Sequence, residues 1–299
     1  MNPAVPPQGL PPAQRRRAMG VLVLGITLAV LDGTILNLAL PDIARSFGAT
    51  PSRAILVVSA YQIATLVMLL PMATLGDLIG YRRVYLGGVA LFALASLGAM
   101  VAPTLDMLIA ARAVQGLGAA GVMSVNAALV RLIYPPSQLG RGMAINSMVV
   151  ATASVAGPTV AAGILSFAAW PWLFALNLPL GLVVIALGRH ALPPNATAAA
   201  PGARIAPLDV LLNVAMFALI FIGADRLAVR DGAQGGLPLQ GLALMGAGLL
   251  VGAVHLQRQR RRVAPLFPVD LLRIPVFALS MSASISAFSA QALAYLSLP

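Results

Sequence analysis

Cysteine, lysine and glutamate are all missing from this 299-residue chain. Without cysteine it has no disulfides, no thiol catalysis and no cysteine-based metal site. Charge is also scarce: arginine and aspartate together make up 9% of the residues, against about 25% charged residues in a soluble domain. Hydrophobic residues reach 60% and the mean hydropathy is +0.92, which leaves too few polar side chains to cover a water-facing surface. The composition excludes a soluble enzyme and a disordered chain.

Long apolar runs, in contrast, recur along the whole sequence. A helix of about 20 apolar residues crosses the roughly 30 Å hydrocarbon core of a bilayer. Runs of about that length do not alternate as the strands of a β-barrel would. We therefore predict an all-α polytopic membrane protein with nine spans, at Ala18–Leu40, Ala54–Leu75, Val84–Ala102, Met107–Val130, Met143–Phe167, Trp172–Leu187, Leu208–Ala224, Leu239–Leu256 and Pro275–Leu298.

The distribution of arginine predicts the orientation. If residues 1–17 are cytoplasmic and each span crosses the membrane, fourteen arginines lie on the inside, four on the outside and one within a span. This is the asymmetry that the positive-inside rule requires. The net charge of +11 then lies at the cytoplasmic face, where it meets anionic lipid, so no nucleic-acid partner is needed to explain it.

Two ionisable residues fall inside apolar spans, where an unpaired charge costs several kcal/mol. Asp32 lies in the first span and Arg112 in the fourth, at similar depths from the outer face. If these spans are neighbours, the two side chains can form an ion pair. Such a pair either locks the bundle as a static element or acts as a proton-linked site. Burial favours the neutral carboxyl group and a nearby guanidinium favours the charged form, so the carboxyl group could gain and lose a proton.

The segment Leu31–Pro41 around Asp32 resembles the first-helix motif of the major facilitator superfamily, and more narrowly of its fourteen-helix drug:proton antiporter branch. Four further motifs agree in order. The fourth span carries Leu108, Arg112, Gln115 and Gly116, and the resemblance implies that this arginine takes part in proton transfer. Trp170, Phe174, Asn177, Pro179 and Gly181 enter the sixth span as the family pattern does. The resemblance implies the major facilitator fold.

The loop between the second and third spans resembles the superfamily's cytoplasmic signature. Asp77, Gly80, Arg82 and Arg83 match it. We expect Gly80 to supply a tight turn, Asp77 to cap a helix end or pair with arginine, and the two arginines to anchor the loop at the lipid surface. Together they form a candidate gating loop.

Gly157 and Pro158, with Gly163 six residues after Gly157, resemble the antiporter signature of the fifth span. Ordinary packing of small residues between helices is the competing interpretation. The remaining polar residues in or near the spans are candidates for lining a substrate cavity: Asn37, Tyr61, Gln62, Gln115 and Asn177.

The resemblance also implies a division of the chain. We expect a disordered cytoplasmic tail (1–17), an N-terminal six-helix half (18–190), a cytoplasmic linker (191–207), two extra membrane helices (208–256), a basic cytoplasmic loop (257–274) and the first helix of a second half (275–299). On this expectation the chain is a truncated part of a longer transporter.

The function implied is proton-driven export of small lipophilic compounds or drugs across the bacterial inner membrane, by a monomer whose N-terminus is cytoplasmic. The energy source is the proton gradient; no cofactor and no metal site is expected. The partners are a small-molecule substrate, protons and the lipid bilayer. Three alternatives remain: a major facilitator importer of a nutrient or metabolite, a nonfunctional fragment, and a membrane enzyme. The last would need a polar catalytic cluster at one interface, and the sequence shows none.

Overall fold

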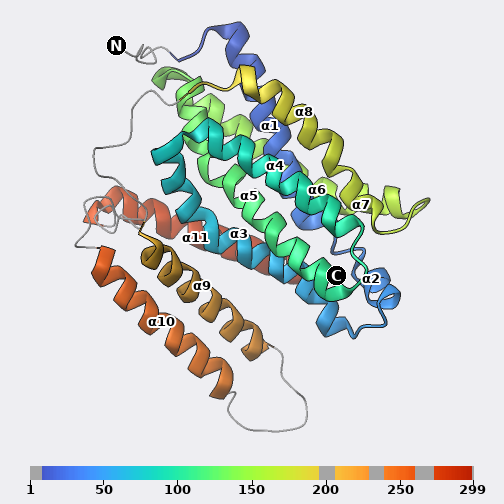
Figure 1. The fold of residues 1–299 in the computed structure, drawn as a ribbon. Coiled ribbons are helices and arrows are strands. Elements are labelled where there is room, and N and C mark those ends of the chain that lie inside the picture. Colours follow the sequence, from blue (N-terminus) through green and yellow to red (C-terminus); the bar gives the residue numbers. More distant parts are fainter. Residues whose placement is uncertain (1–8, 195–205, 229–238, 260–272, 298–299) are drawn as a thin grey trace.

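The computed structural model describes residues 9–194, 206–228, 239–259 and 273–297, and in these ranges every regular element is helical. Figure 1 shows a bundle of long, roughly aligned helices. The elements are α1 (Pro12–Ile35), α2 (Leu40–Ser46), α3 (Pro51–Ile79), α4 (Tyr81–Met100), α5 (Leu105–Ile133), a 3₁₀ turn (Pro136–Gln138), α6 (Leu139–Leu165), α7 (Trp172–Ala175), α8 (Asn177–Ala191), α9 (Pro207–Ala228), α10 (Leu239–Gln259) and α11 (Pro275–Ser297).

Eight helices in the described ranges are long and apolar enough to cross a membrane, which confirms the predicted all-α membrane fold. The ninth predicted span corresponds to α11. Each predicted span coincides with a helix to within a few residues, except at the two ends of the first span and in the sixth span, which is divided into α7 and α8. Most of the predicted linker (191–207) and of the basic loop (257–274) lies outside the described residues.

The first span differs from its prediction at both ends. The predicted disordered tail 1–17 is wrong for residues 12–17, because α1 begins at Pro12 and its first turns are helical. Arg15 holds this end: its guanidinium donates to the Leu10 carbonyl (3.0 Å) and to Gln138 Oε1 (2.5 Å). At the other end α1 stops at Ile35, and a turn leads into the separate helix α2. Pro41 lies in the first turn of α2, and because it has no N–H to donate to the carbonyl of Asn37, four residues earlier, it does not suit the interior of one continuous helix.

Small residues let the central helices approach closely. The Cβ of a residue larger than glycine at position 118 would lie 2.6 Å from the Phe92 nitrogen, so α4 and α5 pack backbone to backbone. At Gly116 a Cβ would lie 2.5 Å from the Tyr61 carbonyl oxygen, which shows the same for α3 and α5. Close packing at small residues is how helices associate in membranes, where no hydrophobic effect drives them together.

The helices α1, α3, α4, α5, α6 and α8 pack against one another, while α9 and α10 pack mainly on each other (Figure 1). Within the first group α1 contacts α5, α6 and α8, which places Asp32 at the centre of the bundle. The pair α9–α10 is joined to it through α9, which lies beside α3.

Candidate functional site

The centre of the bundle holds a buried ion pair. Asp32 lies near the end of α1 and Arg112 in the first third of α5, and Arg112 Nη1 donates a hydrogen bond to Asp32 Oδ2. The two side chains are 1% and 0% exposed. The first and fourth predicted spans are therefore neighbours, as the pairing hypothesis required. Charges so deep in a membrane bundle are stable only when each has partners.

Two amide side chains and a hydroxyl group surround this pair. Gln115 Nε2 and Asn177 Nδ2 both donate to Asp32 Oδ1, at 3.0 and 2.7 Å. The same two nitrogens donate to Ser96 Oγ, at 2.7 and 3.2 Å. Gln115 Oε1 in turn accepts from Arg112 Nη1 at 2.6 Å. These five residues, from α1, α4, α5 and α8, form one network that we call the charge cluster.

Aromatic rings and a backbone carbonyl hold Arg112 on its remaining sides. The Arg112 Cζ atom lies 4.2 Å from the centre of the Tyr61 ring and 5.8 Å from that of Phe174. Arg112 Nε donates to the Val57 carbonyl at 3.3 Å, and the Tyr61 hydroxyl donates to the Ala29 carbonyl at 2.8 Å. Arg112 Nη2 is buried and has no hydrogen-bond partner among the described residues. The guanidinium therefore keeps Nη2 available as a donor nitrogen.

The arrangement makes the Asp32 carboxylate an acceptor of three donors at once. A proton on this carboxylate would remove its charge and place an O–H group among the donors already present, although both oxygens could still accept. Protonation of Asp32 would therefore weaken its attraction to Arg112.

Three of the five residues predicted to line a substrate cavity contact this site: Gln115 and Asn177 belong to the charge cluster, and Tyr61 covers Arg112. The other two do not. Asn37 is exposed in the turn after α1, and Gln62 is exposed on α3. Their contact with a substrate stays a prediction.

The candidate gating loop forms the connection between α3 and α4. Gly80 has φ +107° and ends α3, as expected of the residue that makes the turn. Asp77 lies within α3 and accepts a hydrogen bond from the Tyr81 hydroxyl at 2.5 Å, and no arginine of the described residues lies within 4 Å of its carboxylate. Arg82 and Arg83 donate to the carbonyls of Leu192 and Ile79. The expected cap or arginine pair at Asp77 is thus replaced by a tyrosine contact.

The residues of the antiporter signature separate in α6. Gly157 is buried against α1, where a Cβ would overlap Thr34 Oγ1. Pro158 is exposed, and a Cβ on Gly163 would meet nothing within 4 Å. Close helix packing accounts for Gly157 and leaves Pro158 and Gly163 unexplained.

Sequence reasoning missed Ser96 and the Val57 carbonyl. Ser96 Oγ also donates to the carbonyl of Phe92 in its own helix, and a hydroxyl group satisfied in this way is common in apolar spans. Neither residue therefore gives a signal in the sequence.

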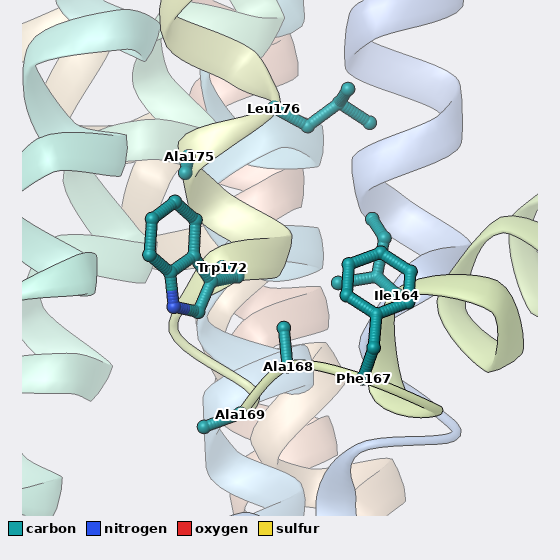
Figure 2. Close-up of a pocket in the computed structure, with 7 residues that line it drawn as sticks. All are labelled: Ile164, Phe167, Ala168, Ala169, Trp172, Ala175 and Leu176. Carbon is teal, nitrogen blue, oxygen red and sulfur yellow. The ribbon is translucent and has the colours of Figure 1, made fainter.

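An open apolar hollow lies at the C-terminal end of α6, beside α7 (Figure 2). It is lined by Ile164, Phe167, Ala168, Ala169, Trp172, Ala175 and Leu176. Ile164 and Phe167 approach from the end of α6, and Trp172 and Ala175 from α7. The hollow contains no member of the charge cluster, although Leu176 directly precedes Asn177.

Charged residues at the centre of a bundle of membrane-spanning helices commonly mark a substrate or ion pathway. The profile of the Major Facilitator Superfamily matches residues 22–299. The chain belongs to this superfamily, whose members are transporters and not enzymes.

Its relatives agree on the class. The chain is 48% identical over 301 residues to "Uncharacterized transporter YebQ" of Escherichia coli (strain K12), covering 99% of this chain and 64% of YebQ. It is 30% identical over 274 residues to "Putative multidrug resistance protein MdtD" of Salmonella heidelberg (strain SL476), covering 91% of this chain and 57% of MdtD. The chain therefore spans about three fifths of the length of these relatives.

The fold also matches a solved transporter. The crystal structure of the human organic anion transporter MFSD10 (TETRAN) aligns with a TM-score of 0.55 and 20% sequence identity, over 88% of this chain and 76% of that chain. At this identity the likeness concerns the fold alone.

Proposed function

We propose that the chain carries the proton site of a proton-driven exporter of small lipophilic compounds. The observation that supports this most is the burial of Asp32 with three hydrogen-bond donors and no other acid in the charge cluster. A single titratable group at the centre of a transporter is the simplest place to bind the coupled proton.

The coupling follows from competition for Arg112. While Asp32 is charged, Arg112 Nη1 is bound to it and to Gln115, which ties α5 to α1. A proton on Asp32 weakens the attraction and leaves the guanidinium, with Nη2 already unpartnered, free to bind another acceptor. The protonated and charged states then favour different arrangements of α1 and α5, and a ligand that prefers one of them shifts the equilibrium.

The substrate class is inferred from the relatives and the surroundings. MdtD is described as a putative multidrug resistance protein, and the likeness of the fifth span to the antiporter signature favours export over import. Aromatic rings next to the cluster, from Tyr61 and Phe174, offer contact to flat lipophilic compounds. No dedicated anion or sugar site is needed for such substrates.

The location and orientation proposed are the bacterial inner membrane with residues 1–17 in the cytoplasm. The arginine asymmetry and the bacterial relatives support both. Residue Arg112 belongs to neither face, because it is buried in the bundle.

The test is gradient-driven transport by the native gene product that contains this chain, in everted membrane vesicles, with the lipophilic dye rhodamine 6G as probe. We expect an imposed proton gradient to drive dye into the vesicles, and Asp32→Asn to abolish this transport per amount of protein in the membrane. Asp106→Asn is the matched control, since Asp106 is a surface residue with a 76% exposed side chain paired to Arg53.

Two results would contradict the proposal. Full gradient-driven transport by Asp32→Asn would show that the proton binds elsewhere and that the ion pair is static. Gradient-driven dye movement out of everted vesicles would favour the importer.

A further inference from the structure

Helix α3 contains a proline in its interior. Pro71 is buried and lies inside α3, which runs from Pro51 to Ile79. Proline has no backbone N–H, so the carbonyl of Val67, four residues earlier, loses its usual helical donor. In a membrane the carbonyl has no bulk water to bind, so another donor, such as a side chain of a neighbouring helix, replaces the missing N–H.

The donor comes from α9. Asn213 Nδ2 donates to the Val67 carbonyl oxygen at 2.7 Å, and the Asn213 side chain is fully buried. Because a carbonyl accepts and cannot donate, the amide must present its nitrogen here, so the orientation of this side chain is not arbitrary. Asn213 and Pro71 are 142 positions apart in the sequence.

We propose that Asn213 is the positioning residue that docks the α9–α10 pair on α3, by supplying the hydrogen bond that Pro71 removes. The contact lies between two parts of α3 that have different partners. In the part before Pro71 the Tyr61 and Thr65 hydroxyls donate to carbonyls of α1 and α5. The part after Pro71 contains Asp77 of the candidate gating loop. Because helices bend most easily at proline, the α9–α10 pair contacts α3 at the position where α3 can bend.

Helices α9 and α10 are joined by an ion pair and by close packing. Asp209, one turn before Asn213 on the same buried side of α9, accepts from Arg258 Nε of α10 at 3.2 Å. At Gly223 and Gly248 a Cβ would lie 2.7 Å from side-chain atoms of the facing helix. A contact that holds α9 against α3 therefore also fixes the position of α10.

The test is a mutant cycle read by hydrogen exchange. In the purified protein Asn213→Leu leaves the Val67 carbonyl buried without a donor, and we expect amide exchange to rise about tenfold in α9 and in α3 around Val67, while α4 keeps its protection. Leu211→Ala, on the exposed side of α9, is the matched control and should leave both helices unchanged.

The second arm restores the missing donor from within α3. In Pro71→Ala the new residue supplies the N–H that reaches the Val67 carbonyl. The rise in amide exchange caused by Asn213→Leu should therefore fall to less than a third of its value in the native background. An equal effect of Asn213→Leu in both backgrounds would overturn the proposal, and so would unchanged exchange in α3 and α9. If the leucine variant does not fold, Asn213→Ala completes the same cycle.

Discussion

The replacement Asp32→Asn is the sharpest perturbation of the charge cluster, because the cluster offers this side chain only donors. Arg112 Nη1, Gln115 Nε2 and Asn177 Nδ2 all point hydrogens at the two carboxylate oxygens. An asparagine has one oxygen and one NH2 group, so in either orientation its NH2 group faces a donor. The variant keeps the volume of the side chain and loses both the charge and one acceptor.

The magnitude follows from the burial of the partner. Arg112 keeps its charge at 0% exposure, and removing one member of a buried ion pair costs about 3–5 kcal/mol of unfolding free energy. Removing the second charge should recover most of this. We therefore expect Asp32→Asn combined with Arg112→Gln to be more stable than the sum of the single variants by about 2–3 kcal/mol.

The assay is unfolding in mixed detergent micelles, followed by circular dichroism of the helices, for the native protein, both single variants and the double variant. Asp106→Asn is the control and should change stability by less than about 1 kcal/mol, as is usual for exposed pairs. A loss of unfolding free energy below about 1 kcal/mol in Asp32→Asn, or strict additivity in the double variant, would refute the reasoning. Leaving a buried guanidinium unpaired is expected to cost more than that.

Two further predictions concern packing and topology. In Gly157→Ala the new Cβ overlaps Thr34 on α1 and should cost about 1–3 kcal/mol of unfolding free energy, whereas Gly163→Ala, with open space around it, should be neutral or stabilising in the same unfolding assay. Since the chain has no cysteine, Ser52→Cys and Ser137→Cys can be labelled singly in whole cells: a membrane-impermeant maleimide should reach position 52 in intact cells and position 137 only after lysis, and the reverse pattern would overturn the proposed orientation.

Much of the fold and four of the five residues of the charge cluster could be predicted from the sequence. The apolar runs fixed eight helices because a membrane leaves the backbone no alternative to helix. Asp32 and Arg112 stood out for the same reason, since a charge in an apolar run needs a partner. Gln115 followed from its position three residues after Arg112, on the same face of α5.

What could not be predicted depends on contacts between distant segments. The contribution of Ser96 depends on the approach of α4 to α8, and nothing near residue 96 indicates it. Asn213 is a single amide in an apolar run, and its role exists only because Pro71 leaves a carbonyl free in another helix. The helix at residues 12–17 was not predicted, and its hydrogen bond from Arg15 to Gln138 joins segments 123 positions apart.

The central claim, that Asp32 carries the coupled proton, is tested most directly by proton release on binding. Rhodamine 6G is added to the purified native gene product in weakly buffered detergent solution with a pH indicator. If binding of the dye competes with protonation of Asp32, the native protein releases protons in proportion to the dye bound, and Asp32→Asn binds dye and releases none. Proton release from Asp32→Asn equal to that of the native protein would contradict the account.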